Sequence, residues 1–264
     1  MNSLMLVLVL AASESPYDVD WAVDGTVAGG ALGLSILVSE INPSLPGGLS
    51  CARMLETRCD PSVLNSMDAT VVGNDSQGWE TVSDIGLWGG LLIPFAANGL
   101  DLATGDSTER GRDFGRDSLV MAQAIGVNAF VTTLAKAAFR RPRPTHYVTG
   151  KDLSAVQESY SFPSGHASAT ASGMASWATT FALRRPNSPW RFAVIGSAVA
   201  WTGVTAYGRV RAGRHFYTDV LAGVILGSAV GFLVPKLHER DTDNSSEAAA
   251  DRSNPMLIQI GGRF

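Results

Sequence analysis

The segment from Arg209 to Asp219 combines a histidine, a carboxylate and several arginines. His215 and Asp219 are four residues apart, so a helix would place them on one face. A carboxylate at one ring nitrogen fixes the tautomer of an imidazole and leaves the other nitrogen free for nucleophilic attack. Arg209 adds a cation that suits an anionic substrate. The alternative is a surface His–Asp pair beside arginines at a membrane face, and the segment alone does not decide between them.

A second histidine lies in the sequence Pro163-Ser164-Gly165-His166, directly before an apolar stretch. Pro and Ser favour the start of a helix, and the free N–H groups of a helix N-terminus bind anions. Gly165 would let the backbone approach a ligand closely, and the Ser164 hydroxyl would donate another hydrogen bond. His166 would then stand at the edge of a bound phosphate, placed for proton transfer. The alternative is a helix cap with an incidental histidine.

Basic residues form a third cluster, Lys136-Ala-Ala-Phe-Arg-Arg-Pro-Arg143-Pro144, at the end of another apolar stretch. Lys136 and Arg143 are seven residues apart, which is about two helical turns, so both can face one side until the prolines end the helix. Two fixed cations suit an oxyanion such as phosphate. The alternative is that these residues anchor an apolar helix at a membrane interface.

Six long apolar stretches carry these clusters at their ends. Each is too long for an ordinary strand and is rich in alanine and leucine, so all six are predicted to be helices. They cover 21–39, 86–104, 118–138, 166–183, 190–207 and 215–234. In an up-and-down bundle, the end of the third, the start of the fourth and the junction of the last two lie on one side. Three cations, two histidines and a helix N-terminus would therefore converge there.

The expected fold class is all-α, a bundle of about six apolar helices with the active site at one end. Apolar residues make up 45% of the chain and charged residues 17%, below the usual charged share of soluble domains. The stretches have the length of a bilayer core, which predicts a membrane-embedded bundle. A mean hydropathy of only +0.12 leaves a soluble alanine-rich bundle as the alternative. The net charge of −4 gives no field that would attract nucleic acid.

The three clusters, in this order and spacing, resemble the signature of the type-2 phosphatidic acid phosphatase and vanadium haloperoxidase superfamily: K-x6-RP, then PSGH, then SR-x5-H-x3-D. The matching positions are Lys136, Arg143, Pro144, Pro163, Ser164, Gly165, His166, Arg209, His215 and Asp219. The resemblance covers roughly residues 84–235. One position departs from the pattern, because Gly208 stands where the family usually has serine. That change removes a hydroxyl but no residue with a principal chemical role.

The resemblance implies a metal-independent phosphatase without a cofactor. His215 would attack phosphorus and form a phosphohistidine, and Asp219 would orient His215. His166 would protonate the leaving alcohol and then activate water. The phosphate-binding residues would be Lys136, Arg143, Ser164, Gly165 and Arg209.

The connections between the apolar stretches carry few further signals. The run 105–117 is rich in charge and is predicted to be a solvated linker or helix start, so Glu109, Asp113 and Asp117 do not indicate a metal site. Cys51 and Cys59 allow one small-loop disulfide, which would imply an oxidising compartment. Two unpaired thiols are the alternative.

We divide the chain into four parts. Residues 1–13 resemble a secretory signal that lacks the usual basic start, or else form an uncleaved N-terminal extension. Residues 14–83 hold the first helix and a polar loop, and 84–237 form the phosphatase core. Residues 238–264 are polar and are expected to be a disordered tail.

By resemblance, the substrate is a lipid phosphate or pyrophosphate within the membrane. Undecaprenyl pyrophosphate, phosphatidic acid, phosphatidylglycerol phosphate and lipid A phosphates all fit. We expect an inner-membrane protein of bacterial type whose active site faces the periplasm, with a soluble periplasmic protein as the alternative. Arg184, Arg185 and Arg191, with no acidic residue nearby in the sequence, favour a cytoplasmic loop at the opposite end.

Two other functions remain open at the level of sequence. The first is a vanadium-dependent haloperoxidase, because the same pocket can hold vanadate as a cofactor, although the chain is short for that group. The second is a non-catalytic helical membrane protein whose basic residues only anchor it. The intact set of His166, His215 and Asp219 argues against this second function.

Overall fold

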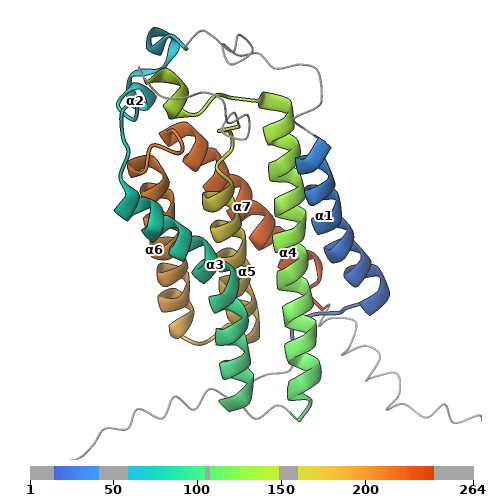
Figure 1. Ribbon diagram of the computed structural model, residues 1–264. Coiled ribbons are helices and arrows are strands. Elements are labelled where there is room, and N and C mark those ends of the chain that lie inside the picture. The colour runs from blue at the N-terminus through green and yellow to red at the C-terminus, as the bar shows by residue number, and fades with distance from the viewer. Residues whose placement is uncertain (1–14, 42–58, 105–107, 149–159, 241–264) are drawn as a thin grey trace, which may run out of the picture.

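The computed structural model describes residues 15–41, 59–104, 108–148 and 160–240 of the chain. Within these residues, six long helices run side by side as a bundle (Figure 1). Their bounds are α1 (Trp21–Ile41), α3 (Gln77–Thr104), α4 (Arg110–Phe139), α5 (Gly165–Arg184), α6 (Trp190–Arg211) and α7 (Tyr217–Leu237). The expected all-α bundle is confirmed. Short helices at one end of it are η3 (Pro61–Val63), α2 (Ser66–Ala69) and η4 (Pro144–Tyr147).

The contact between α5 and α7 brings two helix N-termini to the same end of the bundle. Gly223, Gly227 and Gly231 recur every four residues along α7 and face α5. A methyl group on Gly227 would lie 2.1 Å from the Ser168 carbonyl oxygen, so this approach requires glycine. Small residues let helix backbones pack this closely. The packing fixes the start of α5 against the start of α7.

Helices α3 and α4 begin earlier than the sequence predicted. Gln77 starts α3 inside the expected polar loop, so a boundary at residue 84 would divide this helix. Arg110 starts α4 inside the expected linker. Pro94 lies within α3, which bends along its length (Figure 1), and α7 continues through Pro235, where it was expected to stop. Each proline removes one helix hydrogen bond, but both are buried, and packing in the bundle outweighs that loss.

The bundle has apolar side chains on its outer surface and many polar ones inside. Ile36, Trp88 and Ile225 are exposed. Between α4 and α5, in contrast, the buried Ser168 hydroxyl donates to Asn128 Oδ1 at 2.7 Å. Soluble domains show the reverse distribution. Helices α1, α3 and α7 and the segment Arg110–Tyr147 are long and apolar enough to cross a membrane.

Charges expected in solvated connections are buried at the end of the bundle opposite the short helices. Asp113 and Asp117 lie within α4 and are almost fully buried. Asp117 accepts a hydrogen bond from Ser15 Oγ at 2.8 Å and forms an ion pair with Arg184. Arg184 also pairs with Asp101 at 3.0 Å, and Arg185 pairs with Asp101 as well. Asp113 and Asp117 thus lie near the start of a helix, as the sequence allowed, but the prediction that they are solvated was wrong, and Arg184 and Arg185 are not exposed loop charges.

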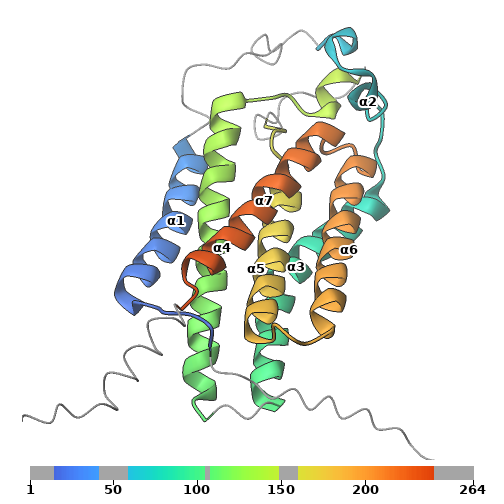
Figure 2. The same ribbon diagram turned by 180° about the vertical axis from the view of Figure 1, so that it is seen from behind.

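Both ends of the described chain meet at this same far end (Figure 2). Tyr17 forms an antiparallel bridge with Glu239, and the Arg240 N–H donates to the Pro16 carbonyl at 2.9 Å. Residues 238–240 therefore belong to the folded body and not to the expected tail. The remaining predictions for 1–13 and 241–264, and the position of Cys51, lie outside the described residues. Cys59 is disulfide-bonded.

Candidate active site

The end of the bundle that carries the short helices gathers residues of all three sequence clusters. We call it the site end. Its residues come from the end of α4 and the segment after it (Lys136, Arg143), the start of α5 (Ser164, Gly165, His166), the end of α6 (Arg209), the connection between α6 and α7 (His215) and the start of α7 (Asp219). Arg143 is close enough for its charge to act on Lys136, on Arg209 and on both histidines.

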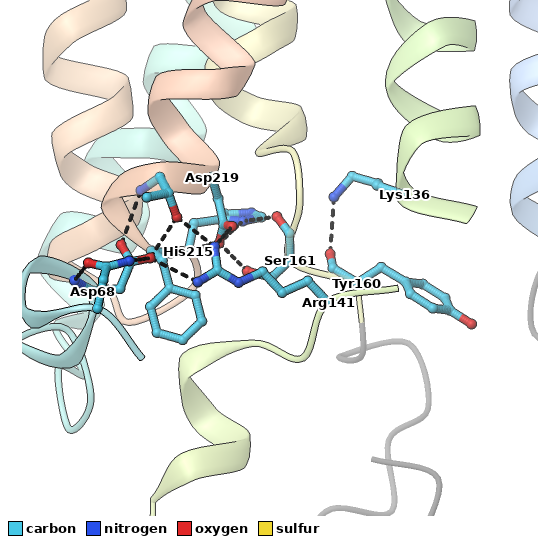
Figure 3. Close-up of polar contacts among 10 residues, drawn as sticks. Asp68, Lys136, Arg141, Tyr160, Ser161, His215 and Asp219 are labelled. Atoms are coloured by element: carbon cyan, nitrogen blue, oxygen red, sulfur yellow. Dashed lines mark hydrogen bonds and ion pairs between the residues drawn. The ribbon is translucent and has the colours of Figure 1, made fainter. Parts of the chain in front are cut away.

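His215 lies in the short connection between α6 and α7, and it is 2% exposed. Its Nδ1 donates to the Ser161 carbonyl oxygen at 2.8 Å (Figure 3). Because a carbonyl oxygen only accepts, the proton is on Nδ1 and the lone pair is on Nε2. Burial lowers the pKa of His215 well below its ordinary value, and the charges of Lys136 and Arg143 lower it further. The ring is therefore a neutral imidazole with a nucleophilic Nε2.

Asp219 orients His215 less directly than the sequence suggested. Its Oδ2 lies 3.8 Å from His215 Nδ1, which is too long for a hydrogen bond. Asp219 instead accepts hydrogen bonds from Ser161 Oγ, from Arg141 Nη1 at 2.6 Å and from the Phe216 N–H at 2.8 Å. Since the carbonyl of Ser161 holds the imidazole, the fully buried Asp219 positions His215 through Ser161.

Arg141 and Asp68 extend this network, and neither was singled out from the sequence. Arg141 donates to Asp219 and, at 2.8 Å, to Asp68 (Figure 3). Its guanidinium carbon lies 4.3 Å from the centre of the Phe216 ring. Asp68 also accepts from the Thr218 hydroxyl at 2.6 Å. Burial alone would raise the pKa of Asp68, but the hydrogen bonds from Arg141 and Thr218 hold it below its usual range.

The sequence carried a signal for one of these two residues only. Arg141 lies between Lys136 and Arg143 in the basic cluster, so its neighbourhood was already marked. Asp68 lies in the polar loop within residues 14–83, far along the chain from every motif. Only the folded chain brings it to the start of α7.

His166 occupies the first turn of α5, as the sequence predicted for a residue after a helix cap. Ser164 is the N-cap, and its hydroxyl accepts from the Ala167 N–H at 3.5 Å. His166 Nε2 lies 2.9 Å from Oδ1 of Asp84, a residue of α3 that the sequence motifs did not include. A methyl group on Gly165 would make only ordinary contact, 3.6 Å from Lys136 Cε, so close packing does not demand glycine there.

The cations at the site already have partners in the protein. Lys136 Nζ donates to the Tyr160 carbonyl at 3.1 Å (Figure 3). Arg209 Nη1 lies 3.3 Å from Asp84 Oδ1 and also 3.3 Å from Ser83 Oγ. These contacts hold the two side chains at the site end, where they can turn to an anionic ligand.

Gly208, the one departure from the family pattern, is where α6 packs closely on α3. A methyl group there would lie 2.9 Å from Ser83 Cβ and 3.0 Å from the Trp79 carbonyl oxygen. The close approach places the Ser83 hydroxyl against Arg209. A hydroxyl is therefore present beside this arginine, but it comes from another helix.

The arrangement combines a neutral imidazole, a second histidine, a capped helix N-terminus and three cations. Such a site can bind a phosphate group by charge and by the N–H groups of α5, and it can offer a nitrogen nucleophile to the phosphorus. Among the described residues, no group of three or more His, Cys, Asp or Glu side chains is arranged to hold a metal ion.

Comparisons with known proteins show what this chain is similar to. Residues 118–243 match the family model of the PAP2 superfamily. An undecaprenyl-diphosphatase of Sulfolobus acidocaldarius is 31% identical over 116 residues, which cover 44% of this chain and 50% of that protein. The match thus spans about half the length of the curated relative. The crystal structure of a transmembrane PAP2-type phosphatidylglycerolphosphate phosphatase from Bacillus subtilis has a TM-score of 0.49 and 20% identity, covering 88% of this chain and 99% of that one.

Proposed function

We propose that this protein, whose residues 118–243 match the family model of the PAP2 superfamily, is a phosphatase that removes phosphate from a lipid phosphate or diphosphate. The reaction proceeds through a phosphohistidine on His215 and needs no metal ion. The observation that carries the proposal is the buried His215, whose Nδ1 donates a hydrogen bond to the Ser161 carbonyl and whose pKa is lowered by burial. Its Nε2 is the nitrogen left for attack, beside a group of cations that can hold a phosphate.

The first half of the reaction transfers the phosphoryl group to the protein. The lone pair of His215 Nε2 forms a bond to phosphorus, and the bond between phosphorus and the leaving oxygen breaks. His166 gives its proton to that oxygen, so the product leaves as an alcohol or a protonated phosphate. Lys136, Arg143 and Arg209 stabilise the charge on the phosphoryl oxygens throughout.

The second half returns the protein to its starting state. His166, now neutral, takes a proton from a water molecule, and the water oxygen attacks phosphorus. The bond between phosphorus and Nε2 breaks, and inorganic phosphate leaves. The hydrogen bond from His215 Nδ1 to Ser161 favours this ring orientation in both halves.

We also propose that the bundle lies in a membrane with the site end on the periplasmic side. Four segments can cross a membrane by length and composition, and the outer surface is apolar. The disulfide-bonded Cys59 donates its N–H to the His146 carbonyl at 3.3 Å, which places it at the site end. Disulfides persist in oxidising compartments such as the periplasm. Both ends of the described chain would then face the cytoplasm.

The phosphohistidine can be trapped with a substrate that carries ³²P in its phosphate. Wild-type protein quenched during turnover should carry a label that is stable to alkali and labile to acid. His215→Ala should carry no label and release no phosphate, because the attacking nitrogen is absent. EDTA should leave wild-type activity unchanged.

A matched control is His238→Ala. His238 is also a histidine in a polar contact, with Asp24 at 3.1 Å, but it lies at the far end of the bundle. This variant should keep both the label and the activity. Phosphate release by His215→Ala at the wild-type rate would overturn the mechanism.

A further inference from the structure

Asp84 is an acidic residue at the site that phosphate binding does not explain. Its Oδ1 contacts both His166 Nε2 and Arg209 Nη1, and its side chain is 50% exposed. A carboxylate in this place competes with a phosphate for Arg209. The position of Asp84 against His166, the proposed acid/base residue, indicates that Asp84 acts on the leaving group and not on the bound phosphate.

The contact with His166 places Asp84 on the leaving-group side of the site. His166 must come within hydrogen-bond distance of the leaving oxygen to protonate it. The leaving group therefore stands next to the His166 atom that Asp84 contacts. A carboxylate beside an imidazole favours its protonated form. Burial, together with the charges of Arg209 and Arg143, lowers the pKa of His166 to about 4, whereas the contact with Asp84 acts in the opposite sense.

Asp84 and Thr81 also line one end of an apolar groove along α3. The groove has a volume of about 410 Å³, and Trp201 of α6 forms one of its walls. Its apolar lining on α3 consists of Ile85, Trp88, Gly89 and Leu92. The indole N–H of Trp201 donates to the Gly86 carbonyl at 2.8 Å, which fixes that wall. The groove thus leads from the reacting end along a helix that can cross a membrane.

We propose that Asp84 and this groove form the leaving-group subsite, an assignment that rests on the proposed function. In this subsite, Asp84 favours a neutral lipid alcohol over an anionic leaving group. The hydrocarbon of the alcohol lies in the groove. A phosphate monoester releases an uncharged alcohol once His166 has protonated it. A diphosphate instead releases a second phosphate group, whose negative charge would stand beside the Asp84 carboxylate. Like charges this close repel one another, so the preferred substrate is the phosphate monoester of a membrane lipid.

Farnesyl phosphate and farnesyl diphosphate test this selection because they share one hydrocarbon. The measured quantity is the ratio of their kcat/KM values for the full-length protein in detergent. Asp84→Asn should lower the ratio of monoester to diphosphate roughly tenfold, because the repulsion of the diphosphate leaving group is lost. Asp84→Glu keeps the charge and should keep most of the preference. Asp84→Ser also removes the charge, because serine is neutral and smaller. It replaces Asp84→Asn in the experiment if that variant does not fold.

Glu80→Gln is the matched control, because it removes a negative charge one helical turn earlier on α3. Glu80 pairs with Arg214 at 2.8 Å and does not contact His166. Its ratio should equal that of the wild type. An unchanged ratio in both neutral Asp84 variants would overturn the assignment. A wild type that releases phosphate from neither compound would instead overturn the proposed function, and this assignment with it.

The pH profile separates positioning of His166 from a merely structural role. Loss of the carboxylate makes protonated His166 less favourable, so the alkaline limb of kcat for farnesyl phosphate should move to lower pH in Asp84→Asn. Glu80→Gln should leave this limb in place. A limb that does not move in Asp84→Asn would show that Asp84 does not hold the proton of His166.

The groove is tested by a second matched pair on α3. Leu92 lines the groove and Leu100 does not, and their exposed fractions are similar, 61% and 67%. Leu92→Ala should raise KM for farnesyl phosphate roughly threefold through lost apolar contact, while Leu100→Ala should not. Neither change should affect kcat/KM for p-nitrophenyl phosphate, which has no long chain. Equal KM values in the two variants would exclude the groove as the hydrocarbon site.

Discussion

At the scale of single residues, the reactivity of His215 depends on a backbone carbonyl. Ser161 holds the imidazole through its carbonyl oxygen, and Asp219 holds Ser161 through its hydroxyl. Arg141 in turn binds Asp219 and Asp68. A chain of hydrogen bonds therefore orients the nucleophile. Each side chain in this chain of contacts satisfies the polar groups of its neighbours, so the contacts support one another.

Burial of a neutral His215 makes the stability of the protein depend on pH. The pKa of His215 in the folded state lies well below the ordinary value of 6.5 that applies to the unfolded chain. As the pH falls below that value, the unfolded state binds a proton that the folded state does not bind. The free energy of unfolding should therefore decrease with falling pH. The variant His215→Gln lacks this titrating group. Between pH 7 and pH 5, its free energy of unfolding should therefore decrease by about 1 to 2 kcal/mol less than that of the wild type.

Thermal unfolding of both proteins across this range provides the measurement. Because the carboxylates titrate in both proteins, the difference between the two curves isolates the contribution of His215. Parallel curves would mean that His215 binds a proton equally well in the folded and unfolded states, which would contradict the lowered pKa of His215.

At the scale of elements, the site depends on how closely α5 and α7 approach. The glycines of α7 allow carbonyl oxygens of α5 to approach the α7 backbone more closely than a residue with a side chain would permit. This contact sets the separation between His166 at the start of α5 and His215 just before α7. Helix α3 completes the site by carrying Ser83 and Asp84 to the end of α6.

Gly227→Ala should destabilise the protein by about 1 to 3 kcal/mol and reduce activity, because the new methyl group meets the Ser168 carbonyl. Gly196→Ala in α6 is the control, since nothing lies within 4 Å of a methyl group there. That change should be neutral or stabilising by up to about 1 kcal/mol, as alanine favours helix. Thermal unfolding and kcat measure both effects. Equal stability of the two variants would show that the α5–α7 contact can relax.

At the scale of the whole molecule, the bundle separates its chemistry from its anchoring charges. The site end carries the histidines and cations, whereas the far end buries Arg184 with Asp101 and Asp117 and joins Tyr17 to Glu239. Removing one partner of a buried ion pair costs about 3 to 5 kcal/mol, so this network ties three helices together. Since Arg184 and Arg185 are buried, they do not support the prediction of a cytoplasmic loop from its positive charges.

The orientation of the bundle can be read from the accessibility of single cysteines in intact cells. Ser66→Cys places a thiol at the site end, and Asn187→Cys places one in the exposed connection between α5 and α6 at the far end. A membrane-impermeant maleimide should label Ser66→Cys from outside and Asn187→Cys only after the membrane is opened. The reverse pattern would put the site end in the cytoplasm.

The sequence by itself determined the number of long helices and the convergence of three motifs, because apolar length and ordered spacing are local properties. It also predicted the capped start of α5 at Ser164. It missed Asp84, Asp68 and the indirect role of Asp219, because these depend on contacts between residues far apart in the chain. It also assigned Asp117 to solvent, since sequence shows a charge but not its partner. Only the tertiary structure, by packing α3 against α5 and α6, decided what surrounds each histidine.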